Sequence, residues 1–290
     1  MAKPSQEYLL HGGVQFPSIV HSEERLKYTT NEFQVLEDDV FNVTYPKSGT
    51  TWMQEILTLI YSDGDTTFSH SVPNWERVPW IEQTSAPAYL EKLSSPRLFT
   101  SHLPVHLFPK SFFQSKAKVI YTARHPKDVC VSLYHYYRLA CFLQDHEDFE
   151  EFLSAFLEGN VLMGSWFDHV RAWLGFRDQV NILFLTYEEL LQDLRGSVVR
   201  ICDFLGRQLD EAALDSVAEN ATFKAMKDNK MTNYSLVPSE IMDPKMGNFY
   251  RKGISGDWKN HFSQAQSDRF DQVYREKLKG LEDAFPWTKP

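Results

Sequence analysis

Short β-rich runs alternate with helical stretches along this chain, and the alternation leaves few folds open to it. β-branched and aromatic residues concentrate in four runs: Asp39–Tyr45, Arg97–Ser101, Lys118–Ala123 and Asn181–Thr186. Apolar spacing and helix-start signals predict helices over Thr51–Ser62, Pro126–Leu139, Tyr187–Asp193, Gly196–Leu205 and Ser263–Leu278. Strands that alternate with helices in this way predict an α/β fold, in which helices flank a central parallel sheet.

The whole chain, residues 1–290, is predicted to form one domain, because no repeat, low-complexity tract or linker interrupts it. One long segment, Phe223–Gly256, is expected to be irregular. It holds two prolines and three glycines and shows little periodicity. A loop of this length in a compact domain is usually functional or disordered.

Composition excludes several classes of protein. The chain has 30 lysines and arginines against 39 acidic residues, a net charge of −9, so it lacks the broad basic face that non-specific nucleic-acid binding needs. Three cysteines, Cys130, Cys141 and Cys202, match neither a disulfide framework nor a zinc site. The chain shows no signal-peptide pattern and no apolar run near the roughly 18 residues that span a membrane. We therefore expect a cytosolic protein without a metal or a membrane span.

The motif YPKSGTTW, at positions 45–52, joins the first predicted strand to the first predicted helix. A tight polar loop in this place aims backbone N–H groups and the positive end of a helix dipole at an anion. Lys47 adds a charge, Gly49 lets the backbone approach a ligand, and three hydroxyl groups add donors, those of Ser48, Thr50 and Thr51. The lysine precedes the glycine, so this P-loop-like motif is not GxxxxGK[ST]. The alternative is a plain strand-to-helix turn with a solvated lysine, which the flanking strand and amphipathic helix disfavour.

Four chemically active residues follow the four predicted strands. Lys47, His102, Arg124 and Tyr187 each come just after one strand. In an open parallel sheet, ligands bind outside the carboxyl ends of the strands. A lysine, an imidazole, an arginine and a phenol are therefore expected to converge on one edge.

Two groups of cations suit further phosphates. Arg124 stands before the helix that begins at Pro126, although it could instead form a surface ion pair with Asp128. Arg251 and Lys252 precede a Gly-x-x-Gly sequence at the end of the irregular segment. That stretch alone fits a phosphate clamp and an ordinary solvated loop equally well.

Taken together, these motifs resemble those of the cytosolic sulfotransferases. The matches are TYPKSGTTW (44–52), RHPKDVCVS (124–132) and RKGISGDWKNHF (251–262), in the family's order and spacing, together with SHLP (101–104), GSWFDH (164–169) and YEEL (187–190). The resemblance covers nearly the whole chain. VPNWERVPW (72–80) and SPRLFTSHLP (95–104) are most like the hydroxysteroid, or alcohol, branch.

The resemblance implies the donor 3′-phosphoadenosine 5′-phosphosulfate (PAPS) and a role for each matching residue. Lys47, Ser48, Gly49, Thr50 and Thr51 would hold the 5′-phosphosulfate, and Trp52 would stack on the adenine. The 3′-phosphate would be bound by Arg124, Ser132, Arg251, Lys252 and Gly253, and the adenosine would be surrounded by Tyr187, Thr222, Phe223 and Phe249. His102 would be the general base. The acceptor would be a lipophilic alcohol, such as a steroid, a sterol or a bile-acid-like molecule. Its pocket would be lined by Phe16, Trp75, Trp80, Tyr137 and Tyr234. In a chain that is 14% aromatic, each of these rings could equally be a core residue.

The chemistry of the residues agrees with this implication. Sulfuryl transfer needs in-line positioning, stabilisation of charge on the leaving oxygen and removal of the acceptor proton. His102 can take that proton, and Lys47 can stabilise the departing phosphate.

Two departures from the family pattern stand out. The 3′-phosphate stretch reads Arg-His-Pro-Lys where relatives more often have Arg-Asn-Pro-Arg. The family's dimer motif, Lys-x-x-x-Thr-Val-x-x-x-Glu, begins here at Lys259 but continues Ser263-Gln264 and ends at Asp268. A homodimer is still expected, although this motif is degenerate.

Three alternatives remain open at this point. The first is a phenol-preferring sulfotransferase of the same fold. The second is a non-catalytic protein that binds a nucleotide or a lipophile, which the presence of both His102 and Lys47 disfavours. The third is a P-loop nucleotide kinase, which the missing GxxxxGK[ST] motif disfavours.

Overall fold

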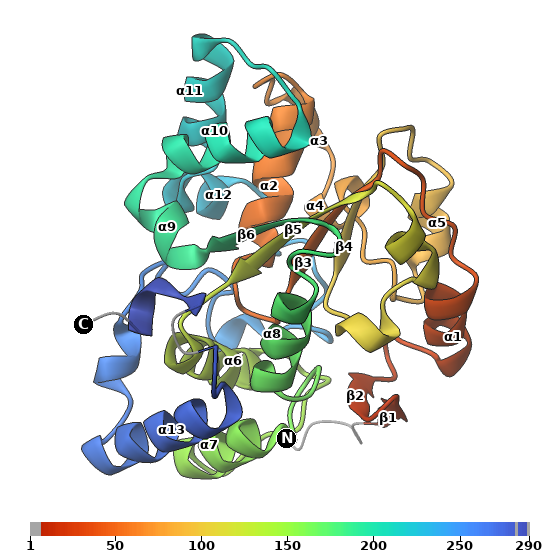
Figure 1. Cartoon of the computed structure of the whole chain (residues 1–290). Helices are drawn as coiled ribbons and strands as arrows, with labels where there is room; N and C mark the ends of the chain where they lie inside the picture. Colours follow the sequence, from red (N-terminus) through yellow and green to blue (C-terminus); the bar gives the residue numbers. More distant parts are fainter. Residues whose placement is uncertain (1–6, 282–283, 289–290) are drawn as a thin grey trace.

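The computed structural model describes residues 7–281 and 284–288 and confirms the α/β prediction (Figure 1). Four parallel strands form the central sheet in the order β4-β3-β5-β6. Their bounds are β3 (Val40–Thr44), β4 (Leu98–Ser101), β5 (Lys118–Ala123) and β6 (Asn181–Thr186). All four strand predictions are therefore confirmed, two of them without any difference in bounds.

The register of the sheet brings the strand ends together. β3 pairs with both β4 and β5, so that Asn42 lies opposite Thr100 on one side and Ile120 on the other. β5 in turn pairs with β6 up to Ala123 and Thr186. Because every strand runs in the same direction, the segments that follow them leave from one edge of the sheet.

Helices cover both faces of the sheet (Figure 1). One face packs against α2 (Thr50–Tyr61), α10 (Leu194–Leu205) and α11 (Glu211–Asn220) through an apolar cluster that includes Val40 and Ile120. The other face packs against α6 (Pro126–Leu139), α7 (Phe149–Glu158), α8 (Trp166–Gly175) and α13 (Gln264–Lys277) through a second cluster that includes Phe41 and Val119. Adjacent strand residues point to opposite faces, so both faces are buried, as a parallel sheet requires.

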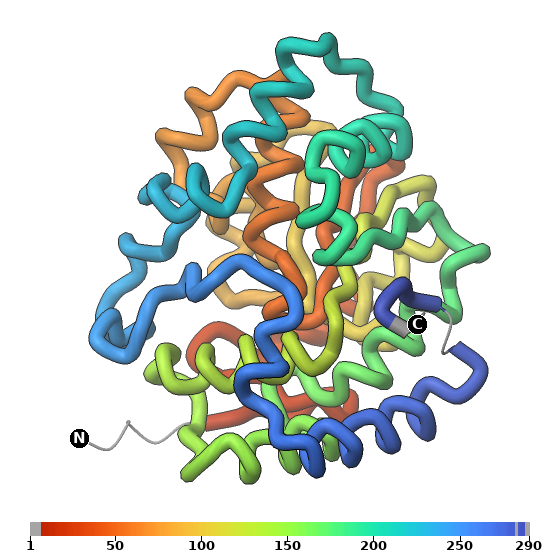
Figure 2. The backbone as a smooth tube through the Cα atoms, turned by 90° about the vertical axis from the view of Figure 1, so that its left-hand side faces the viewer, coloured from red at the N-terminus to blue at the C-terminus, as the bar shows by residue number. Residues whose placement is uncertain are grey.

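Shorter helices complete the chain. They are α1 (Glu23–Asn31), α3 (Thr67–Ser71), α4 (Asn74–Arg77), α5 (Ala86–Leu90), α9 (Tyr187–Gln192) and α12 (Phe223–Asp228), with 3₁₀ turns at η1 (Val105–Leu107), η2 (Lys110–Gln114), η3 (Pro244–Met246), η4 (Asp257–Asn260) and η6 (Pro286–Thr288). The five predicted helices are confirmed with bounds that differ by no more than two residues. Figure 2 shows the blue chain after α12 crossing the molecule before it enters α13, which lies along α7. Arg269 in α13 forms a 2.7 Å ion pair with Glu150 in α7.

Two features of the fold differ from the sequence predictions. The segment Phe223–Gly256 is not irregular throughout, because it begins with the α12 helix. Thr222 caps that helix by accepting a hydrogen bond from the Ala225 N–H, and the prolines and glycines come only later. An antiparallel hairpin near the N-terminus, β1 (Tyr8–His11) with β2 (Val14–Pro17), was not predicted.

Candidate active site

The loop between β3 and α2 has the geometry expected of an anion-binding turn. Its backbone adopts positive φ at Lys47 (69°) and at Gly49 (104°). The hydroxyl groups of Thr44 and Thr50 lie 2.6 Å apart, and Asn42 donates to the Thr50 carbonyl over 3.0 Å, so both ends of the turn are fixed. In the described part of the chain, no side chain caps the start of α2. Its first N–H groups are therefore available to a ligand.

Three buried polar atoms at this turn have no hydrogen-bond partner among the described residues. They are Ser48 Oγ, Trp52 Nε1 and Arg124 Nε. A buried polar atom without a partner costs free energy, and such atoms in a native fold call for an explanation. They come from the loop, from α2 and from the end of β5, and they fit a polar ligand that binds across all three.

Lys47 is a cation in an apolar cage. Its Nζ lies 4.5 Å from the centre of the Tyr136 ring and 4.2 Å from that of Phe249. Burial, together with the nearby charges of Arg124 and Arg251, lowers the pKa of Lys47 to about 7. An anion bound beside this lysine would favour its charged form.

Arg124 lies where the sequence predicted, beside the loop. Its two terminal nitrogens donate to the carbonyls of Lys47 and Ile254, each over 3.0 Å, and its guanidinium stacks on Tyr187. Its Nε remains without a partner, as described above. The alternative ion pair with Asp128 is wrong, because that carboxylate accepts hydrogen bonds from backbone N–H groups instead.

The C-terminal cations arrive on the segment that crosses the molecule in Figure 2. Asp128, at the start of α6, accepts from the N–H groups of Gly256 (2.6 Å) and Trp258 (2.9 Å) and so holds this segment against the sheet edge. Arg251 and Lys252 each lie 2.6 Å from the buried carboxylate of Asp257. The two cations are therefore oriented side by side.

The residues implied for the adenosine surround the same place. Trp52 contacts Tyr187 edge to face, with ring centres 5.1 Å apart. Gly253 has a φ of 68°, and a Cβ atom there would lie 2.1 Å from Phe223. Thr222 and Phe223 begin α12, and Ser132 lies partly exposed on α6.

His102 follows β4 and is held by three buried groups. Its Nδ1 donates to the Thr44 carbonyl over 2.8 Å, which leaves Nε2 as the nitrogen that can accept a proton. Its backbone N–H donates to Glu82 over 2.8 Å, and its carbonyl accepts from His169 over 3.1 Å. Burial and the charge of Lys47 lower the pKa of His102 to about 4, so the ring is neutral at neutral pH.

The aromatic residues predicted for the acceptor divide into two groups. Trp80 lies 6.1 Å from the His102 ring, and Trp75 lies 5.5 Å from Tyr234. Tyr234 in turn stacks at 4.0 Å on Phe249, which covers Lys47. Three of the predicted rings thus lie close to His102 or to the rings that cover Lys47.

Phe16 and Tyr137 form the second group and lie in the apolar core. Phe16 packs on the His21 ring, with centres 5.1 Å apart, and the Tyr137 hydroxyl accepts a hydrogen bond from the Leu162 N–H. Their contact with an acceptor stays a prediction.

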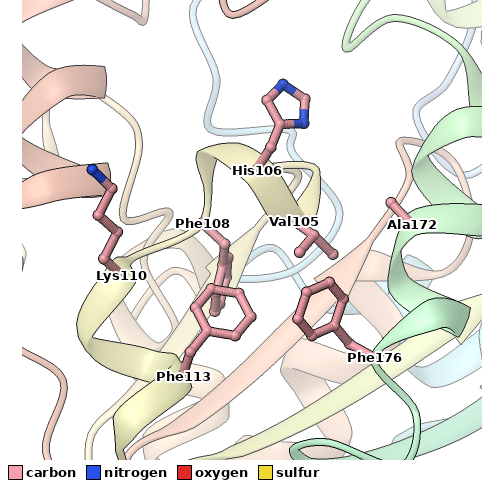
Figure 3. A pocket seen from close by; sticks show the side chains of 7 residues that line it. All are labelled: Val105, His106, Phe108, Lys110, Phe113, Ala172 and Phe176. Carbon is pink, nitrogen blue, oxygen red and sulfur yellow. The ribbon is translucent and has the colours of Figure 1, made fainter.

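A pocket of about 440 Å³ opens beside the stacked rings of Tyr234 and Phe249. Its lining includes Leu139, Tyr234, Met242, Phe249 and Tyr250. A second pocket, of about 400 Å³, is lined mainly by Val105, Phe108, Phe113 and Phe176 (Figure 3). None of the predicted site residues lines this second pocket.

Other predictions can be compared with the described residues. Among them, no cluster of three His, Cys, Asp or Glu side chains could hold a metal ion. No described helix is both long enough and apolar enough to cross a membrane. Cys130 is buried, and burial raises the pKa of its thiol well above the ordinary value, as expected of an inert cysteine.

Sequence reasoning missed four residues of the site. Tyr136 covers Lys47, Asp257 orients the two C-terminal cations, and Glu82 and His169 hold the backbone of His102. His169 and Asp257 lie inside the GSWFDH and RKGISGDWKNHF motifs, but a spacing pattern does not show which polar residue contacts which.

Comparisons with known proteins agree with this geometry. A family model for the sulfotransferase domain matches residues 37–282. "Sulfotransferase 2B1" of Rattus norvegicus is 53% identical over 98% of this chain and 83% of its own length. The "3-beta-hydroxysteroid sulfotransferase" of Cavia porcellus is 46% identical over 98% of this chain and 99% of its own length.

A solved structure shares the architecture. Retinol dehydratase in complex with androsterone and the inactive cofactor PAP superimposes with a TM-score of 0.83 at 26% identity, over 98% of this chain and 93% of that one. The fold is thus a known one, and the chain is a member of the sulfotransferase family, to which relatives named as hydroxysteroid sulfotransferases also belong.

Proposed function

We propose that the protein transfers the sulfuryl group of PAPS to a hydroxyl group of a lipophilic alcohol, such as a steroid, a sterol or a bile-acid-like molecule. The observation that carries the proposal is the set of three unpartnered buried atoms, Ser48 Oγ, Trp52 Nε1 and Arg124 Nε, around one anion-binding turn. The relatives named for hydroxysteroids and the neighbour in complex with PAP support it. Residues 1–290 act as one sulfotransferase domain, since both apolar clusters share a single sheet.

The donor fits the residues present. The Lys47–Thr51 turn and the start of α2 suit the 5′-phosphosulfate, and the pair Arg251 and Lys252, with Arg124, suits the 3′-phosphate. Trp52 and Tyr187 offer aromatic faces to the adenine. PAPS supplies the activated sulfuryl group; the chain supplies orientation and charge.

Each reacting group then has a defined task. His102 Nε2 takes the proton of the acceptor hydroxyl as that oxygen forms its bond to sulfur. The bond between sulfur and the 5′-phosphate oxygen breaks, and Lys47 stabilises the negative charge that appears on this oxygen. The proton is held on His102 until solvent removes it. Water is kept out by the aromatic rings of Tyr136, Phe249 and Tyr234.

The acceptor is lipophilic because its side of the site is aromatic. Trp75, Trp80 and Tyr234 present large apolar surfaces, and the 440 Å³ pocket that Tyr234 lines is of the size that small-molecule ligands fill. A phenol-preferring enzyme would need the same donor site and the same base. The panel of acceptors described below distinguishes the two.

The protein acts in the cytosol as a homodimer in this proposal. Three cysteines whose spacing matches no disulfide framework suit a reducing compartment. The degenerate dimer motif begins at Lys259 in η4 and ends at Asp268 in α13. Sedimentation at two concentrations tests the dimer, and a monomer at both would contradict it.

The function is tested by transfer of labelled sulfate from PAPS to hydroxysteroids, sterols, bile acids and simple phenols, without added metal. We expect turnover on the alcohols, and a loss of about 100-fold or more in His102→Ala and Lys47→Met. The exposed residues His70 and Lys116 provide matched controls, His70→Ala and Lys116→Met, that should keep full activity.

Other outcomes are equally informative. Turnover on phenols alone would contradict the alcohol preference. Binding of PAPS without turnover on any acceptor would favour a carrier. ATP with Mg²⁺ should give no transfer, because the kinase alternative alone predicts it.

A further inference from the structure

Glu82 is a fully buried carboxylate that contacts the proposed base. It follows α4 in sequence and has no solvent exposure. Its Oε1 accepts the His102 N–H over 2.8 Å, while its Oε2 is buried and has no partner among the described residues. A glutamine could accept the same N–H bond without the cost of burying an ionisable group. A buried ionisable carboxylate at this position therefore calls for a role beyond accepting hydrogen bonds.

Hydrogen bonds hold both the N–H and the carbonyl of His102. Glu82 holds its N–H, and His169 Nε2 donates to its carbonyl. His169 Nδ1 must then accept, and it does so from the Tyr121 hydroxyl over 2.8 Å. Glu82 and His169 therefore fix the position of the His102 backbone, and the Nδ1 bond to Thr44 fixes the tautomer of the imidazole. Of these three residues, Glu82 is the one with a carboxylate.

Charge around His102 is otherwise unfavourable to protonation. Burial and Lys47 both disfavour the imidazolium form. Arg25, from α1, donates to the Ile81 carbonyl over 2.9 Å and 2.6 Å and lies close enough to favour the ionised form of Glu82. His21 and His169 also face His102, and burial lowers the pKa of His21 to about 4 and that of His169 to about 3, so neither carries a charge near neutral pH.

We propose that Glu82 is a positioning residue that fixes the His102 backbone and whose negative charge stabilises the imidazolium formed when His102 takes the acceptor proton. The inference rests on the proposed role of His102. In the proton transfer, the acceptor O–H bond breaks, an N–H bond forms at Nε2, and the positive charge appears on the residue whose backbone N–H the Glu82 carboxylate accepts. Glu82 itself exchanges no proton with the substrate.

This role predicts a particular pH dependence. Burial raises the pKa of Glu82 to about 7, against the hydrogen bonds from His102 and Ser101 and the charge of Arg25. Between pH 5.5 and 8 His102 stays neutral, and bound donor keeps Lys47 charged. The ionisation of Glu82 therefore controls kcat in this window, and kcat should rise with pH through about 7.

The test is the pH profile of kcat at saturating PAPS and acceptor for the wild type, Glu82→Gln and Glu82→Asp. We expect Glu82→Gln to lower kcat at pH 8 by at least about tenfold and to abolish the rise near pH 7, while the dissociation constant for PAP changes less than about twofold. Glu82→Asp keeps the charge, so it should retain the rise with a smaller loss of kcat.

Glu55→Gln is the matched control. Glu55 is also buried, in α2, where it pairs with Arg77 over 2.8 Å. This variant should lose stability but keep the rise in kcat near pH 7. A Glu82→Gln profile that retains the wild-type rise, whatever its kcat, would show a purely structural role and overturn the proposal. So would a wild-type profile that is flat between pH 5.5 and 8. Wild-type enzyme inactive on every acceptor would instead contradict the proposed function.

Discussion

The pKa of Lys47 should depend on whether an anion is bound beside it. In the free protein, burial and two neighbouring arginines lower its pKa to about 7. Bound phosphates reverse this effect and raise the pKa again, because opposite charges favour the protonated form. At pH 8 the free lysine is mostly neutral and the bound one charged, whereas at pH 6 it is charged in both states.

Binding of PAP should therefore take up about one more proton at pH 8 than Lys47→Met takes up, with little difference between the two proteins at pH 6. Calorimetry in buffers of different ionisation enthalpy measures this uptake. Equal uptake by the wild type and Lys47→Met at pH 8 would contradict the assignment. Protons are taken up rather than released because the pKa of Lys47 is lowered in the free site and rises again when the ligand binds.

Gly253 offers a second test at the scale of one residue. A Cβ atom at this position would meet Phe223 at 2.1 Å, and the backbone there has a φ of 68°. Gly253→Ala should weaken PAP binding by about tenfold or more, because Phe223 or the 251–253 backbone must shift. Gly13 is the control, since it has a φ of 80° but, among the described residues, nothing within 4 Å of an added Cβ. Gly13→Ala carries the same backbone cost without the clash, so it should leave PAP binding unchanged.

At the scale of elements, α6 serves as the anchor for the segment that brings the C-terminal cations. Asp128, in the first turn of α6, holds the N–H groups of Gly256 and Trp258. Charge-assisted hydrogen bonds of this kind are stronger than neutral ones, so Asp128→Asn should loosen the segment. We expect the dissociation constant for PAP to rise about tenfold, with kcat at saturating PAPS changed much less.

The control for that prediction lies in another helix. Asp168 is exposed in the first turn of α8, and Asp168→Asn should not affect PAP binding. If Asp128→Asn lowers kcat at saturating PAPS while leaving PAP affinity unchanged, the anchoring role is wrong.

At the scale of the whole molecule, ligand binding and folding are linked. In the proposed site PAP would contact residues from the β3–α2 loop, α2, α6, α9 and the C-terminal segment, so it should bind only the folded chain. PAP at 100 times its dissociation constant should raise the free energy of unfolding by about 2.7 kcal/mol, which corresponds to a rise in melting temperature of roughly 5–10 °C. Thermal unfolding with and without PAP measures the shift, and AMP, which lacks the 3′-phosphate, should give a smaller one.

The sequence predicted the sheet and its edge well, because the central strands are buried on both faces and read as continuous apolar runs. Lys118–Ala123 was placed without error for this reason, whereas Asn181–Thr186 is a partly buried edge strand and was placed correctly from its β-branched and aromatic residues. α12 was missed because the prolines and glycines further along its segment outweighed the Thr222 cap and the good helix formers after it. The contacts of Glu82 were not predictable, since they depend on a tertiary approach between residues that no local pattern connects.

The buried carboxylate of Asp257 has a consequence for how fast the nucleotide is captured. It accepts hydrogen bonds from Lys252, Asn260 and Arg251, which hold its pKa well below the usual range despite its burial. The two cations have thus already lost much of their rotational freedom before a ligand arrives. One anion cannot neutralise both, so an excess of positive charge remains to attract a phosphate. Arg251 and Lys252 are thus already oriented when the nucleotide arrives, which favours fast association without a slow rearrangement of the site.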